Sequence, residues 1–209
     1  MSAREEILER IRQHGRPETE LPGEFTQGVV YDDRLQQFRE VLESIGGQCC
    51  EAENADDVSR RLESVEAYSS ASKIVSLVPG VGRSTFDVEA VDDPHDLEDV
   101  DFAILPGRLA VAENAAIWVT DDRIRHRVLY FLPQHLALVV PADRIVHNMH
   151  EAYAQIDPAA TRFAAFIAGP SKTADIEQSL VIGAHGAKSL TVILIGRSGQ
   201  SDGEAARSS

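Results

Sequence analysis

The sequence predicts one α/β domain built on an open, mixed or mostly parallel sheet flanked by helices. The chain has 209 residues, of which 43% are hydrophobic and 26% charged, so it can form one well-packed core but is short for two. From about residue 33, segments with apolar residues at helical spacing alternate with short aliphatic runs bounded by turn residues. This alternation is typical of strands joined by helical crossovers.

The N-terminal segment predicts a helix that stands outside the main core. Ser2 and Glu5 form a capping box, and a short apolar stripe follows, which predicts a helix over 3–13. The stretch 14–28 contains two prolines and three glycines and reads as a linker. We therefore expect a helix and linker over 1–28, the α/β domain over 29–197, and a disordered polar tail over 198–209.

Two helix-to-strand units open the domain. A helical face over 33–45 is stopped by two glycines, and the run QCCEA (48–52) follows as a strand. Asn54 caps a second predicted helix, and KIVSLVP (73–79) is the next strand. One of the two adjacent cysteines in the first strand is expected to face inward and the other outward.

The rest of the chain predicts more strands and two further helices. Strands are expected in DFAILP, LAVAENAAIWVT and HLALVV, and a helix over 142–156 whose histidines, His147 and His150, face solvent. The last third reads as strand, turn, helix, turn and strand between 163 and 195. This order predicts a right-handed parallel crossover.

Composition excludes several classes of function. The net charge of −14 opposes binding of a phosphate backbone, so nucleic acid is not an expected partner. No apolar run reaches the ~20 residues of a membrane helix, and the charged start is unlike a signal peptide, which predicts a cytoplasmic protein without membrane insertion. The two cysteines, Cys49 and Cys50, are too few for an iron–sulfur cluster or a structural zinc. No nucleotide or nicotinamide motif is present, so we predict no cofactor and no metal.

The segment Gly169–Gly186 holds the candidate binding site. Gly169 and Pro170 open a turn after a strand, Ser171 or Thr173 can cap the following helix, and Lys172 supplies a positive charge. Helix N-termini of this kind bind anions, so the turn predicts a site for a small carboxylate or phosphate. The alternative is that the hydroxyls only cap a helix while the lysine points into water.

Two groups are candidates for acid–base chemistry. His185 lies in a turn, where its ring is not needed for packing, and Glu113 ends an apolar strand beside Asn114. Asp175, Glu177 and Gly186 are expected to support the site, although carboxylates in a first helical turn also stabilise a helix without any chemistry. We expect all these residues to meet at the carboxyl edge of the sheet.

The run GPSKTADIEQSLVIGAHG followed by SLTVILIG resembles the signature of LUD-domain proteins of lactate utilisation, close to the protein C type. The resemblance is convincing over the last half of the chain. It implies a fold similar to the sugar-phosphate isomerase and CoA-transferase group. It also implies a part in oxidising lactate to pyruvate beside partners that carry iron–sulfur clusters, while the protein C type lacks the cluster cysteines.

Three consecutive positions depart from the family pattern. Where members commonly read AETGT, this chain has Asn114, Ala115 and Ala116 after the glutamate. A glycine and a hydroxyl group are lost, which bears on the identity of the ligand.

Three functions remain open from the sequence. The first is an accessory component of a lactate-oxidising complex that acts with iron–sulfur subunits. The second is a stand-alone enzyme acting on a phosphorylated or CoA-thioester metabolite, as the fold group permits. The third is a scaffold protein.

Overall fold

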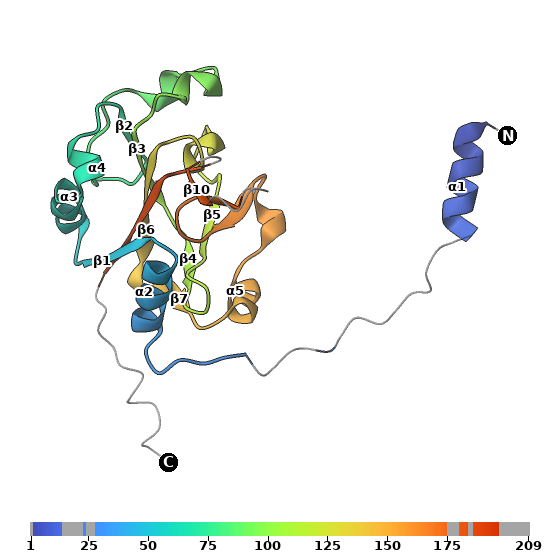
Figure 1. Ribbon diagram of the computed structural model, residues 1–209, viewed down its shortest axis with the longest axis horizontal. Helices are drawn as coiled ribbons and strands as arrows, with labels where there is room; N and C mark the ends of the chain where they lie inside the picture. Colours follow the sequence, from blue (N-terminus) through green and yellow to red (C-terminus); the bar gives the residue numbers. More distant parts are fainter. Residues whose placement is uncertain (1, 14–22, 24–27, 175–179, 184–185, 197–209) are drawn as a thin grey trace, which may run out of the picture.

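A five-stranded parallel sheet forms the centre of the molecule (Figure 1). In the computed structural model, residues 2–13, 23, 28–174, 180–183 and 186–196 are described. The strand order is β1–β11–β6–β3–β2, and every neighbouring pair is parallel. The strands are β1 (Gln48–Ala52), β2 (Ile74–Ser76), β3 (Phe102–Pro106), β6 (His135–Pro141) and β11 (Ser189–Ile195). The predicted open, mostly parallel α/β sheet is therefore confirmed.

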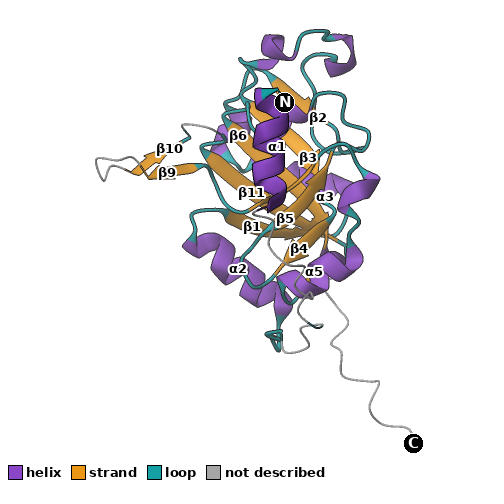
Figure 2. Cartoon of the chain, turned by 90° about the vertical axis from the view of Figure 1, so that its right-hand side faces the viewer, coloured by secondary structure: helices purple, strands orange, loops and turns teal. Residues whose placement is uncertain are grey.

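A second, mixed sheet packs against the first. Its order is β7–β4–β5–β8, with β4 and β7 parallel and the other two pairs antiparallel. The strands are β4 (Leu109–Val111), β5 (Ile117–Thr120), β7 (Ile145–Val146) and β8 (Ala164–Ile167). A separate hairpin of β9 (Lys172–Ala174) and β10 (Leu180–Ile182) projects from the body of the molecule (Figure 2).

Helices α1 (Ala3–Gln13), α2 (Arg34–Ser44) and α3 (Ala55–Glu63) begin where the sequence predicts. Helices α4 (Glu66–Ser69) and α5 (Met149–Gln155) also lie in the described part of the chain. Short 3-10 turns lie at Val88–Ala90, Pro94–Leu97, Arg127–Tyr130, Ala142–Arg144 and Pro158–Ala160. Asp33 caps α2 by accepting from the N–H of Gln36 at 2.9 Å, and Asn54 caps α3 by accepting from the N–H of Asp57 at 3.0 Å. Helix α1 has its predicted capping box but buries no residue, and it stands apart from the sheets (Figure 1).

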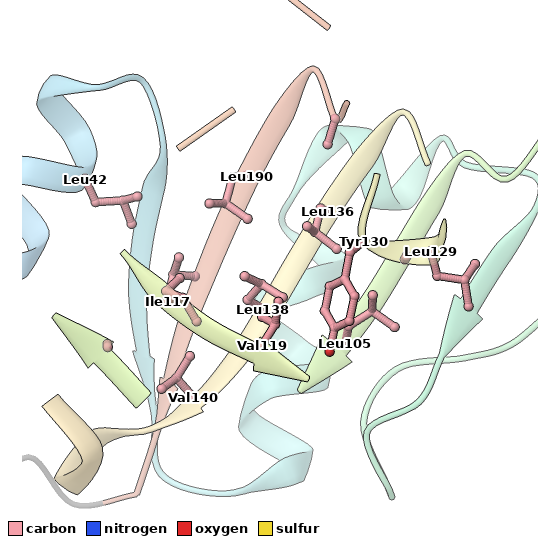
Figure 3. Packing of buried hydrophobic residues seen from close by; sticks show 14 of the residues in the cluster. Leu42, Leu105, Ile117, Val119, Leu129, Tyr130, Leu136, Leu138, Val140 and Leu190 are labelled. Atoms are coloured by element: carbon pink, nitrogen blue, oxygen red, sulfur yellow. The ribbon is translucent and has the colours of Figure 1, made fainter. Parts of the chain in front are cut away.

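The main core fills the space between the two sheets. Leu105 and Leu138 of the parallel sheet face Ile117 and Val119 of β5, and Tyr130 lies beside them (Figure 3). A second cluster lies on the other face of the parallel sheet, where α3 and α4 cover it, and a third packs α5 on the outer face of the mixed sheet. Cys49 contacts the first cluster and Cys50 the second, so the expected alternation of the two thiols is confirmed.

The predicted helix over 142–156 is wrong in its first half. Residues Ala142–Arg144 form a 3-10 turn, and Ile145 and Val146 pair with β4 as strand β7. Helix α5 begins only after Asn148, whose side chain accepts from the N–H of Glu151 at 3.0 Å. His147 consequently precedes the helix. It is half-buried, not solvent-facing, and its Nδ1 accepts from the N–H of Tyr31 at 3.0 Å.

The predicted crossover between 163 and 195 is also wrong. Strand β8 belongs to the mixed sheet and pairs antiparallel with β5, whereas β11 lies in the parallel sheet. The segment between them forms the β9–β10 hairpin where a helix was expected. The Ser171 N–H donates to the carbonyl of Ala187, and the Gly183 N–H donates to the carbonyl of Ser171. These bonds hold the base of a hairpin, so Ser171 and Thr173 do not cap a helix there. The tail over 198–209 lies outside the described residues.

Candidate functional site

The candidate site is a hollow of about 580 Å³ beside the β9–β10 hairpin. Gly169, Pro170, Ser171 and Lys172 all line it, as the sequence predicts, and Asn114 and Gly186 line it too. The remaining lining residues are mostly apolar: Ile45, Tyr130, Phe131, Leu136, Phe166, Ile167, Ala168, Ala187 and Leu190.

Antiparallel pairing brings two distant parts of the chain to this place. Ile117, at the start of β5, pairs with Ile167, at the end of β8. The turn that precedes β5 therefore lies beside the turn that follows β8, which places Asn114 near Gly169.

The hollow lies at the amino ends of the parallel strands, which corrects the expected position at their carboxyl edge. Leu136 and Leu190 line it, and both are second residues of their strands, β6 and β11. The site arises because β8 runs in the mixed sheet and delivers Gly169 to the end of the parallel sheet opposite to the one that a crossover would give.

Gly169 allows the turn above the hollow. Its φ is +70°, in the left-handed region that favours glycine, and an added Cβ would lie 3.0 Å from Cγ1 and Cδ1 of Ile45. At Gly186 an added Cβ would lie 3.1 Å from Cβ of Ser171. Both glycines therefore let backbone segments approach closely around Ser171.

The polar groups of the hollow lie over an apolar floor. The side chain of Lys172 is exposed and has no ion pair or hydrogen bond with another residue in the described part of the chain. Ser171 is half-buried, and Asn114 uses its Oδ1 to accept from the N–H of Ala116 at 3.0 Å. No Asp or Glu lines the hollow within the described residues. One cation beside neutral donors and an apolar floor suits a small organic anion.

Tyr130 contributes its ring and not its hydroxyl group. The hydroxyl donates to the carbonyls of Thr120 at 3.1 Å and Pro106 at 3.2 Å, away from the hollow. Burial raises the pKa of Tyr130 well above its usual range, so the phenol stays protonated at neutral pH. This tyrosine is therefore a fixed wall of the site.

Glu113 lies next to the hollow but is not among the residues that line it. Its carboxylate accepts from the N–H of Met149 at 3.0 Å, at the start of α5. Thr173 lies in β9. His185, Asp175 and Glu177 lie outside the described residues. The catalytic roles of Glu113 and His185 therefore stay predictions.

The departure from the family pattern has a structural counterpart. Ala115 has a φ of +55°, a left-handed conformation, at the position where the family commonly carries glycine. Ala115 is also fully buried in the main core. The turn thus keeps a backbone conformation that favours glycine, although Ala115 carries a methyl side chain.

Sequence reasoning missed the aromatic and aliphatic walls of the site. Phe131 and Phe166 line the hollow, yet in the sequence they are ordinary apolar residues of a turn and a strand. No pattern in the sequence marks them, and only the structure shows that Phe131, a large apolar residue beside the hollow, is 40% exposed.

Two features are absent from the residues that the structure describes. No helix among them is long and apolar enough to cross a membrane. No group of three or more His, Cys, Asp or Glu side chains in that part of the chain is arranged to hold a metal ion.

Comparisons with a family model and with individual proteins agree on one family. Residues 87–195 match the LUD domain. Lactate utilization protein C of Exiguobacterium sp. is 28% identical over 92% of this chain and 95% of that protein. The protein of the same name from Geobacillus sp. is 26% identical over 81% of this chain and 80% of its own. The Anoxybacillus flavithermus protein is 34% identical over 42% and 40% of the two chains.

A solved structure shares the fold. The crystal structure of a DUF162 family protein from Deinococcus radiodurans superposes with a TM-score of 0.58. It covers 78% of this chain and 96% of that chain at 20% identity. At this identity the likeness shows the fold alone.

Proposed function

This chain belongs to the LUD domain family, and we propose that it is an accessory component of lactate utilisation that acts with iron–sulfur partner proteins. The observation that carries the proposal is the alignment with a lactate utilization protein C over 92% of this chain and 95% of that protein. The two cysteines of the chain leave the redox centres to other subunits, because a cluster needs about four such ligands.

The proposed role of this chain is to bind a small 2-hydroxy or 2-oxo acid in the hollow beside Lys172. The ammonium group supplies a charge-assisted contact to a carboxylate. The apolar floor, which includes Leu136 and Leu190, suits the methyl group of lactate or pyruvate better than a second charged group. In this proposal Ser171 and Asn114, which also line the hollow, contact the hydroxyl or keto oxygen.

Calorimetric titration of the full chain with lactate and pyruvate tests the binding. Lys172→Ala should weaken binding by about 1.5–3 kcal/mol, the range for a hydrogen bond to a charged group. Lys188→Ala is the matched control, because Lys188 is an exposed lysine of the same region and does not line the hollow. Its Nζ donates to Gln134 Oε1 instead. Equal affinities in the two variants would remove Lys172 from the site.

Reconstitution tests the accessory role. The rate of lactate-dependent reduction of an electron acceptor by the iron–sulfur partners should rise when this chain is added and fall again with Lys172→Ala. Lactate turnover by this chain alone would favour a stand-alone enzyme. An unchanged rate in the reconstituted system would contradict the accessory role.

A further inference from the structure

A second hollow, of about 810 Å³, lies on the face of the parallel sheet that α3 and α4 partly cover. Gln48, Cys50, His135, Ser189 and Thr191 line it from three adjacent strands. Register explains the set, because Ser189 pairs with His135 and Thr191 pairs with Gln48. Further along the same face, the next residues of the three strands, Ala52, Ala137 and Ile193, are apolar and belong to the second core cluster. The amino end of this face is therefore polar and open, while its carboxyl end is packed.

Thr191 is the most informative residue of this hollow. Its exposed fraction is 4%, and its hydroxyl group has no hydrogen-bond partner in the described part of the chain. Among the described residues, the one side-chain oxygen that is both fully buried and without a partner belongs to Thr161. The Thr191 oxygen is therefore not fully buried and is still reached from the hollow. Burying a hydroxyl group without a partner destabilises the folded state. A ligand in the hollow would supply the missing partner.

His135 and Ser189 add a second polar pair. His135 Nδ1 lies 2.8 Å from Ser189 Oγ, which leaves the other ring nitrogen for a ligand. Burial, followed by the charge of Lys188, lowers the pKa of His135, so the ring is neutral at pH 7. The pair thus offers donors and acceptors without charge.

The charges of this hollow differ from those of the Lys172 hollow. Arg61 is accompanied by Glu43 and Glu66, so the charged lining carries one positive and two negative groups. A lining with this balance does not favour an anion. The neutral polar groups, by contrast, are three hydroxyls, two thiols, a carboxamide and an imidazole.

We propose that this hollow is a second binding site, specific for an uncharged small molecule rich in hydroxyl groups, such as a polyol or a simple sugar. Thr191 and the His135–Ser189 pair make the hydrogen bonds that orient it. Its volume lies in the range of about 300–1,000 Å³ found for small-molecule sites. The site is independent of the proposed lactate site, because the two hollows share no lining residue.

Thr191→Val tests the site because valine matches the shape of threonine and lacks the hydroxyl group. Ligand-observed NMR titrations of the full chain would use glycerol, D-ribose and D-glucose as probes. We expect saturable binding of at least one probe, and roughly tenfold weaker binding in Thr191→Val. Without any probe, the melting temperature of Thr191→Val should rise, since an unpartnered hydroxyl has been removed. Thr191→Ser should retain binding.

Lys172→Ala provides the control for independence and should leave probe affinity unchanged. Failure of lactate binding would not affect this test. Absence of saturable binding for all three probes would overturn the proposal. Equal probe affinities in Thr191→Val and the parent chain would do the same.

Discussion

The carboxylate of Glu113 accepts a hydrogen bond from the backbone N–H of Met149 at 3.0 Å, and the N–H of Glu113 donates to the carbonyl of His147 at 3.0 Å. The turn between β4 and β5 is therefore fastened to the start of α5. Glu113→Ala removes the side-chain acceptor from a helix start and should lower the free energy of unfolding by about 1 kcal/mol. Glu113→Gln keeps an oxygen there and should lose less. Urea denaturation measures both, and a lactate-dependent activity lost equally in the two variants would instead support the catalytic prediction for Glu113.

Removal of residues 1–13 should leave the domain folded. Helix α1 buries no residue, so its loss removes no packed core, and we expect the melting temperature to change by less than about 2 °C. Deletion of residues 1–31 is the matched comparison. This deletion removes the hydrogen bond from the Tyr31 N–H to His147 Nδ1 and the bond that Asn148 Nδ2 donates to the Val29 carbonyl at 2.9 Å. It should therefore destabilise the domain measurably. Equal melting temperatures in the two deletions would show that the bonds of Val29 and Tyr31 do not stabilise the domain.

Gly169→Ala should be more harmful than Gly80→Ala. Both glycines have a left-handed φ, +70° and +73°, so both substitutions carry a backbone cost of about 1–2 kcal/mol. At Gly169 the added Cβ also meets Ile45 at 3.0 Å, whereas at Gly80 its nearest neighbour would be Cβ of Ala55 at 3.7 Å. Chemical denaturation gives the difference, and titration with lactate should show weaker binding only for Gly169→Ala. Equal destabilisation would mean that Ile45 moves aside without cost.

Stability should fall at alkaline pH. Burial raises the pKa of the Cys49 thiol to about 11, above its ordinary value, so the folded state keeps the proton that the unfolded chain releases near pH 9. This contribution is complete below about pH 9 and is lost as pH rises towards about 11. Cys49→Ala should reduce the slope of unfolding free energy in this window. An unchanged slope would mean that Cys49 does not titrate as its burial implies.

Local signals in the sequence predicted much of the first half of the fold. Asp33 and Asn54 cap α2 and α3 because a single side chain beside a helix start decides the cap. The segment QCCEA forms β1 as predicted. The hollow also contains the predicted Gly169–Lys172 segment, because a glycine at the end of an aliphatic strand is a local feature as well.

The errors concern long-range pairing. Ile145 fits a helical stripe as well as a strand, and only its pairing with Ala110 decides between them. Likewise, nothing local in the segment around Ile167 tells whether it pairs with β5 or with β11. The Lys172 hollow was placed at the wrong edge for this reason, and its apolar walls were missed because they come from four separate segments.

The position of β11 also fixes an order of events during synthesis. Strand β11 is the last strand among the residues that the structure describes, yet it lies between β1 and β6 and pairs with both. While a ribosome is still making residues 189–195, β1 has no neighbour to pair with, and Leu190 is missing from the wall of the Lys172 hollow. A nascent chain halted before this strand would expose the sides of β1 and β6 to other chains. Folding of the parallel sheet and completion of both hollows are thus postponed until residues 189–195 have left the ribosome.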